Sequence, residues 1–210
     1  AERVNAGFQL GFHAIGDKGV QMALDAFDAS DSTVRERRNH RFRIEHAQVT
    51  NPMQVARCKE LNVIASMQPS HLLTDMRWAE ARLGPIRAAH SYAWAEFAKR
   101  GVPLAFGTDY PVEPVTPFRG LYAAVTRKSE DGKQEYYPQQ KLTMEQAIAA
   151  YTVGAAYAEF AEKDKGKLAP GMLADFAVLD RDLTAIPPEK ILGTQVLRTV
   201  VGGRTVYQGK

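Results

Sequence analysis

Short apolar runs alternate with helical patterns along the first half of the sequence, and this alternation constrains the fold more than any other feature. The runs cover residues 8–12, 42–44, 63–67 and 102–106. Strands that alternate with helices in this way are typical of βα units on a parallel sheet. The chain is therefore predicted to be an α/β protein with four βα units, half the number in a closed eight-stranded TIM-like barrel.

Residues that favour helix starts and helix ends predict several of the helix boundaries. Asn51 and Pro52 predict a helix start, with Asn51 as the cap and Pro52 at the first helical position. Thr143 and Gln146 fit a capping box at the start of a later helix, because they are three residues apart. A further helix is predicted over residues 88–100, where Gly101 suits the C-terminal cap.

Side chains that can do chemistry follow the carboxyl ends of the predicted strands. His13, His46, Gln68 and Asp109 each come at or shortly after the end of an apolar run. In TIM-like barrels the active site forms from the loops at this end of the strands. Two imidazoles on neighbouring strand ends, with a carboxylate nearby, are suitable ligands for a catalytic metal. The pattern therefore predicts a metal site at the mouth of an α/β barrel.

The last part of the chain has a different character. Residues 175–179 and 197–201 are strand-like, and Gly202-Gly203 indicates a hairpin turn after the second of them. We therefore predict two units. Residues 1–162 form the barrel portion, and residues 163–210 form a small β-rich appendage.

Composition and charge argue against several classes of function. The 27 Lys and Arg nearly balance 24 Asp and Glu, so no nucleic-acid partner is expected, and the basic run at 35–41 is predicted to be a solvated loop. No apolar run approaches the length of a membrane span. Cys58 is the single cysteine, which fits a reducing compartment, and a cytoplasmic location is expected. No Gly-rich phosphate loop follows a strand, which argues against a phosphate-binding α/β protein.

Motifs along the whole chain resemble those of the amidohydrolase superfamily, and within it the YtcJ-like group, also called amidohydrolase family 3. The resemblance rests on HAIGD at 13–17, RIEHAQ at 43–48, SMQPSH at 66–71, AFGTDYPV at 105–112, YTVGAAY at 151–157, KGKLAPGMLADF at 165–176 and TVVGG at 199–203. It implies a metal-dependent hydrolase whose barrel stands beside a composite β-sandwich, to which the C-terminal appendage contributes.

The resemblance also implies roles for particular residues. His13 and His46 correspond to metal ligands on barrel strands five and six, and Asp109 to a strand-eight residue that contacts the metal and handles the proton of the attacking water. The implied ion is a divalent metal, with zinc expected. The implied reaction is hydrolysis of a non-peptide, amide-like C–N bond in a small molecule. Gln68 and His71, on strand seven, either contact substrate or stabilise their loop.

One family feature is missing from the chain. The family carries a His-x-His pair on the first barrel strand, and none of the five histidines here is in such a pair. We therefore expect the chain to be the C-terminal portion of a longer enzyme, which binds metal weakly or not at all when isolated and has little activity. Self-association, or pairing with the missing N-terminal half, is expected. The alternative is a noncatalytic or regulatory protein that keeps the fold, in which His13, His46 and Asp109 serve structure.

Overall fold

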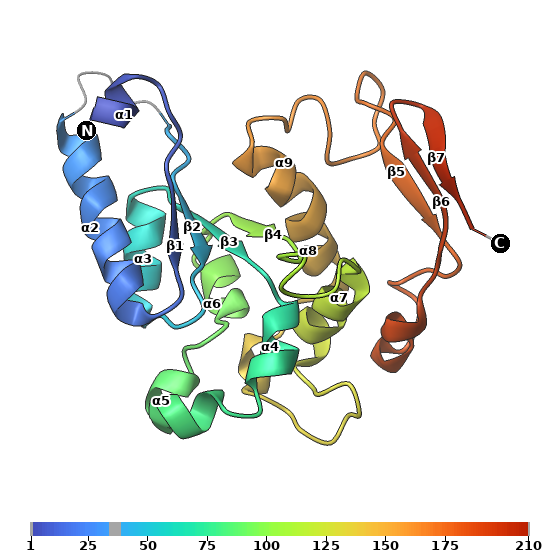
Figure 1. The fold of residues 1–210 in the computed structure, drawn as a ribbon, viewed down its shortest axis with the longest axis horizontal. Helices are drawn as coiled ribbons and strands as arrows, with labels where there is room; N and C mark the ends of the chain where they lie inside the picture. Colours follow the sequence, from blue (N-terminus) through green and yellow to red (C-terminus); the bar gives the residue numbers. More distant parts are fainter. Residues whose placement is uncertain (1, 34–38, 210) are drawn as a thin grey trace.

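A four-stranded parallel sheet forms the centre of the computed structural model, which describes residues 2–33 and 39–209 (Figure 1). Its strands are β1 (Gly11–Ala14), β2 (Arg43–His46), β3 (Ile64–Met67) and β4 (Leu104–Phe106). They lie in sequence order, and each pair of neighbours is parallel. The predicted α/β class with a parallel sheet is confirmed. The first strand begins later than predicted, because its ladder with β2 starts at Gly11, and it includes His13.

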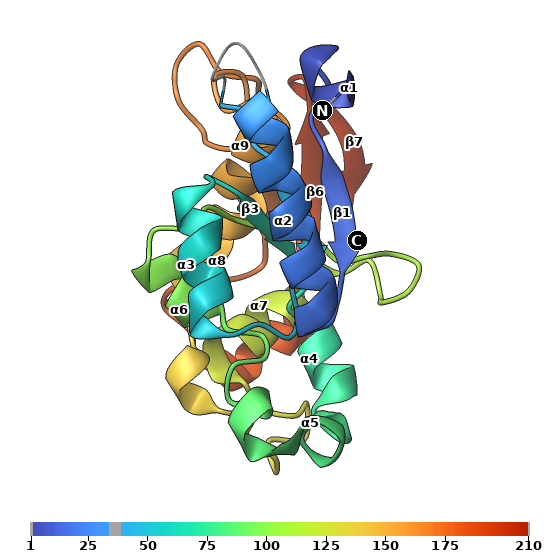
Figure 2. The same ribbon diagram turned by 90° about the vertical axis from the view of Figure 1, so that its left-hand side faces the viewer.

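Helices connect the strands and cover one side of the sheet. A short α1 (Glu2–Asn5) precedes β1, and α2 (Asp17–Thr33), α3 (Pro52–Glu60) and α6 (Trp94–Lys99) lie side by side (Figure 2). The predicted start of α3 is confirmed: Asn51 accepts a hydrogen bond from the backbone of Gln54, and the Gln54 side chain accepts one in return. The apolar face of α2 buries against the sheet through Val20, Leu24 and Phe27.

The helix predicted over residues 88–100 is wrong in its first half. The connection after β3 forms α4 (Ser70–Asp75) and α5 (Ala79–Ala88), and α6 begins only at Trp94. The residues between α5 and α6 bind elsewhere: the Tyr92 N–H donates to the carbonyl of Gln48, and Ser91 forms a bridge with Val49. Backbone groups used in this way cannot take part in a helix ladder.

A second group of helices lies beside β4. It comprises α7 (Pro117–Thr126), α8 (Met144–Ala149), the π-helical η2 (Ala150–Gly154) and α9 (Ala155–Ala158), with a short 3-10 helix η1 (Pro138–Gln140) before α8. Its η2 and α9 members contact β4 directly. The predicted capping box is confirmed, because Thr143 and Gln146 each bind the other's backbone N–H.

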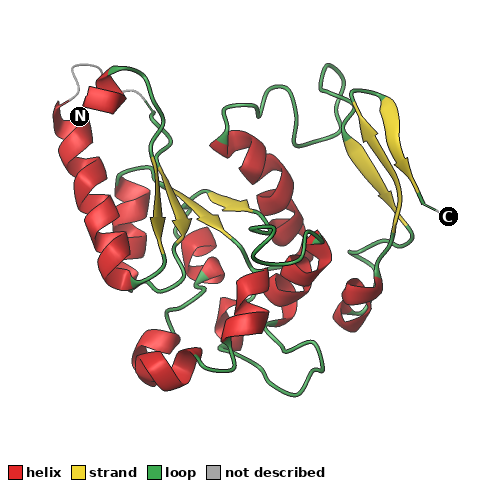
Figure 3. Ribbon diagram, viewed as in Figure 1, coloured by secondary structure: helices red, strands yellow, loops and turns green. Residues whose placement is uncertain are grey.

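The tail forms a separate antiparallel sheet in the order β5 (Phe176–Leu179), β6 (Val196–Val201) and β7 (Arg204–Gln208) (Figure 3). The predicted hairpin turn is present, with Gly202 and Gly203 both at positive φ. The 3-10 helix η3 (Pro188–Gly193) lies between β5 and β6 and packs against α7. Its Ile191 is fully buried in the main core.

The basic run at 35–41 differs from the predicted solvated loop where the structure describes it. Residues 35–38 lie outside the described part of the chain. Arg41 is largely buried: its guanidinium binds both carboxylate oxygens of Glu162 and lies over the rings of Tyr157 and Phe160. In residues 2–33 and 39–209, none of the helices combines the length and apolar character that a bilayer crossing requires.

Candidate metal centre

The strand ends of the parallel sheet bring the predicted site residues to one edge. His13 lies in β1, His46 is the last residue of β2, and Asp109 follows β4 by three residues. His71 belongs to α4, which begins directly after β3 and the two residues Gln68 and Pro69. Because β1 to β4 are parallel and in register, their carboxyl ends meet at this edge.

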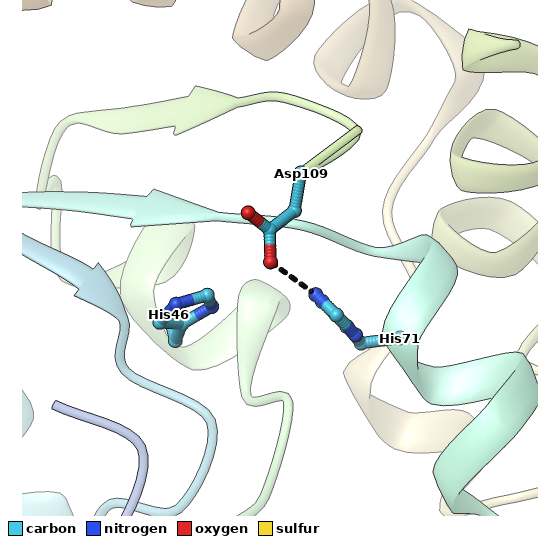
Figure 4. A group of neighbouring side chains, drawn as sticks. All are labelled: His46, His71 and Asp109. Carbon is cyan, nitrogen blue, oxygen red and sulfur yellow. Dashed lines mark hydrogen bonds and ion pairs between the residues drawn. The ribbon is translucent and has the colours of Figure 1, made fainter. Parts of the chain in front are cut away.

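Three of these side chains form a compact group, shown in Figure 4. One possible ligand atom from each of His46, His71 and Asp109 lies within 4.8 Å of the others. The Nε2 atom of His71 is 3.0 Å from Oδ2 of Asp109. His13 stands beside the group and is exposed, with its ring centre 4.4 Å from that of His46. The structure thus brings together with Asp109 a residue, His71, for which the sequence predicted substrate contact or loop stabilisation.

The backbone turns sharply where the site residues are placed. His46, Ala47 and Asp109 adopt left-handed conformations, with φ of 77°, 45° and 62°. Such conformations cost about 1 kcal/mol or more per non-glycine residue and concentrate at functional sites. A hydrogen bond from the Ala47 N–H to the carbonyl of Ala14 holds the first turn in place.

The surroundings of His46 favour its neutral form. The residue is only 7% exposed. Burial, reinforced by the neighbouring His13 and opposed by the Asp109 carboxylate, lowers the pKa of His46 below the ordinary value. A neutral imidazole retains the lone pair that a metal ion requires. Its Nδ1 atom is buried and has no hydrogen-bond partner among the described residues.

The donor set fits a divalent transition metal. Two imidazoles and a carboxylate are the ligands that catalytic zinc sites use. Ligand atoms bonded tetrahedrally at about 2.1 Å lie roughly 3.4 Å apart. The spread of 4.8 Å in this group therefore needs only a modest contraction around an ion.

A hydrogen-bond network fixes the loop that follows β2. The Gln48 amide donates to Asp75 Oδ2 at 3.0 Å and to the Tyr92 hydroxyl oxygen at 2.5 Å, and the Tyr92 hydroxyl donates to Asp75. Asp75 ends α4, the helix that carries His71. The network therefore ties the His46 loop to the His71 helix.

Gln68, the remaining predicted residue, directly follows β3. The Gln68 amide donates to the backbone carbonyl of Ser66 at 3.3 Å, and its Oε1 is buried without a partner among the described residues. A substrate-binding role for Gln68 stays a prediction.

One buried acid near the site was missed in the sequence. Glu113 is 6% exposed and reaches His71, Thr74 and Arg119. Its position four residues after Asp109 carries no signal by itself, because the contacts depend on how α4 and α7 pack.

Comparison with known proteins identifies the family. The family model described as "Amidohydrolase family" matches residues 1–207. The chain is 36% identical to Protein LONG AFTER FAR-RED 3 of Arabidopsis thaliana over 203 residues, and 33% identical to a putative amidohydrolase, YtcJ, of Bacillus subtilis over 204 residues. Each alignment covers 96% of this chain but only 34% and 38% of those proteins, so the chain spans about a third of their length.

A solved structure supports the same assignment. An uncharacterized metal-dependent hydrolase from Pyrococcus horikoshii superposes with a TM-score of 0.74 and is 35% identical. The match covers 87% of this chain and 36% of that protein. The chain therefore belongs to the amidohydrolase family.

Proposed function

We propose that the chain supplies the C-terminal part of the active site of a metal-dependent amidohydrolase, which hydrolyses a non-peptide, amide-like C–N bond in a small molecule. The observation that carries this proposal is the convergence of His46, His71 and Asp109 at the carboxyl edge of the parallel sheet. Family membership and the metal-dependent hydrolase from P. horikoshii support it. In this proposal β1 to β4 are part of a TIM-like barrel, and residues 163–210 contribute to a β-sandwich.

The proposed ligands are His13, His46 and Asp109, with His71 as a further candidate because of its distance to Asp109. The expected ion is zinc, which when bound lowers the pKa of water to about 7 and polarises a carbonyl group. The Asp109 carboxylate then accepts a proton from the attacking water and passes it to the leaving nitrogen. Gln68 and His71 are proposed to contact the substrate. A cytoplasmic location stays a prediction.

A noncatalytic or regulatory role is the second candidate, and the observation that favours it is the 36% identity to Protein LONG AFTER FAR-RED 3, whose name states no hydrolase activity. The two candidates differ in metal content and turnover. A protein that keeps the fold without the chemistry would bind no metal, whereas the enzyme requires it.

The test is metal analysis and hydrolysis of a panel of N-acyl and N-formyl compounds, with the natural polypeptide that carries this chain. We expect stoichiometric metal that is lost in H46A, and a fall in kcat of about 10²- to 10⁴-fold in D109N, because the proton acceptor is removed. His90 is a matched control, since it lies outside the group, and H90A should keep both properties. Metal-free protein, or turnover that survives D109N, would contradict the proposal.

The third ligand is decided by two further variants. If His13 holds the ion, as the family resemblance implies, H13A loses metal and H71A keeps it. If His71 holds the ion, as its place in the compact group suggests, the result is reversed.

A further inference from the structure

Glu113 is a buried carboxylate in the turn that carries Asp109. It follows Asp109 by four residues, and its backbone N–H donates to the Asp109 carbonyl at 3.4 Å. Its side chain is 6% exposed. A carboxylate removed from water to this degree requires charged or hydrogen-bonding partners.

The partners of Glu113 come from two helices. Its Oε1 accepts a hydrogen bond from the Thr74 hydroxyl of α4 at 2.6 Å, and its Oε2 accepts one from Arg119 Nη1 of α7 at 2.6 Å. Thr74 lies three residues after His71, on the same face of α4. Glu113 therefore joins the helix that carries His71 to the turn that carries Asp109.

The His71 ring lies between two carboxylates of this single turn. Its Nε2 is 3.0 Å from Asp109 Oδ2, and its Nδ1 is 3.7 Å from Glu113 Oε1. The second distance is too long for a hydrogen bond but short enough for electrostatic attraction to an Nδ1–H. A ring held on both sides has little freedom to rotate away from Asp109.

The need of Arg119 for a negatively charged partner does not explain why Glu113 is buried. Arg119 has a second carboxylate, since its Nε is 2.9 Å from Oε1 of Glu130. Glu130 is far more exposed than Glu113 and has no contact with His71. Glu113 is the acid that reaches both Arg119 and the site.

We propose that Glu113 is a positioning residue that holds His71 against Asp109. It acts through the Thr74 hydrogen bond, which fixes α4, and through the Nδ1 side of the imidazole. The inference rests on the metal site of the proposed function and takes His71 as one of its ligands, so that Glu113 and His71 form a carboxylate–histidine pair behind the ion. Such outer carboxylates orient metal-site histidines, and their loss typically weakens metal affinity by about 10- to 100-fold.

The test compares E113Q with E130Q in the natural polypeptide, because each change removes one carboxylate from Arg119 and only the first touches the site. Two measurements are made: Co²⁺ affinity by calorimetry, and the position of the His71 ring in crystals of metal-free protein. We expect about 10- to 100-fold weaker Co²⁺ binding in E113Q and less than about threefold in E130Q. The His71 Nε2 to Asp109 Oδ2 distance should exceed about 3.5 Å in E113Q alone.

The outcomes separate this inference from the proposed function. Wild-type protein that binds no Co²⁺ would defeat the metal site, and the ring position would still test the role of Glu113. An E113Q ring that superposes on the wild type, or equal losses of Co²⁺ affinity in E113Q and E130Q, would overturn the positioning role. If E113Q does not fold, T74V removes the hydroxyl donor and keeps the carboxylate. It should weaken Co²⁺ binding about fivefold, and unchanged binding would also overturn the inference.

Discussion

Arg127 shows how this chain accommodates a fully buried cation without a carboxylate. Its guanidinium donates to the backbone carbonyls of Tyr136, Tyr92 and Ser91 at 2.6, 2.7 and 3.4 Å, and lies 4.7 Å from the centre of the Trp94 ring. Burial lowers the pKa of Arg127 to about 9, which leaves it charged at neutral pH. Carbonyl dipoles and the aromatic face replace a counter-ion. The side chain thereby fixes the segment between α5 and α6.

We predict that R127M lowers the free energy of unfolding by about 3 kcal/mol, because buried carbonyls lose their donor while the volume is nearly kept. The measurement is urea denaturation. R82M is the control, since Arg82 also lies over a tryptophan, Trp78, but that ring is half exposed and the expected change is within about 0.5 kcal/mol. A loss in R127M no larger than in R82M would contradict this account.

The candidate site could be predicted from sequence only where a pattern marks it. His13, His46 and Asp109 stand at strand ends, and parallel strands bring such residues together by geometry alone. The contact between His71 and Asp109 depends on the angle at which α4 leaves β3, and no local pattern reports that angle. Glu113 looks like an ordinary loop acid until α4 and α7 are packed around it.

Among the elements, those with their own end signals were predicted and those shaped by distant contacts were not. The starts of α3 and α8 belong to the first kind, since every atom in their caps is local. The break between α5 and α6 belongs to the second, because Ser91 and Tyr92 bind residues 48 and 49 and the side chain of Arg127. The π-helical turn at η2 has the same origin, since it lies where the helix meets β4.

Gly154 in η2 permits the close approach of the helix to β4. A Cβ atom there would stand 2.0 Å from the Leu104 carbonyl oxygen. We predict that G154A lowers the free energy of unfolding by about 2 kcal/mol or more, although Gly to Ala within a helix normally stabilises. Gly19 of α2 is the control, because its Cβ would meet Ala14 Cβ at 3.5 Å, an ordinary contact. G19A should be neutral or stabilising by up to about 1 kcal/mol. The free energy of unfolding is measured by urea denaturation, and a change of the same sign in both variants would contradict this explanation.

The ion pair between Arg41 and Glu162 joins the segment before β2 to the turn that follows α9, and it predicts a pH dependence of stability. The hydrogen bonds from Arg41 lower the pKa of Glu162 from 4.5 to about 2. Because the folded-state pKa is depressed, the stabilisation is fully present above about pH 4.5 and is lost as the pH falls toward 2. We expect the urea midpoint of wild type to exceed that of E162Q at neutral pH, and the gap to close in acid.

The control for that prediction is E60Q, at the exposed end of α3. Its midpoint should differ little from wild type at either pH, since surface charges of this kind change stability by about 0.5 kcal/mol or less. An E162Q gap that stays constant between neutral and acid pH would show that the ion pair does not titrate as described.

At the scale of the whole molecule, the described residues leave much apolar and edge surface uncovered. The parallel sheet ends at β1 and β4, and β7 is an exposed edge strand of the antiparallel sheet. Val201, Val206 and Tyr207 are each at least half exposed. Unpaired strand edges and apolar patches of this kind promote association between chains. The three-stranded sheet thus has the surface of an element that normally packs against a partner.

We therefore predict that the 210-residue chain self-associates, and that V206K in β7 weakens this association, because a lysine on an edge strand opposes pairing. The measurement is light scattering at increasing protein concentration. Met53 of α3 is 81% exposed and lies away from the antiparallel sheet, so M53K adds the same charge elsewhere and should leave association unchanged. A monomer at every concentration would contradict the prediction. Equal effects of V206K and M53K would show that net charge, rather than the β7 edge, controls association.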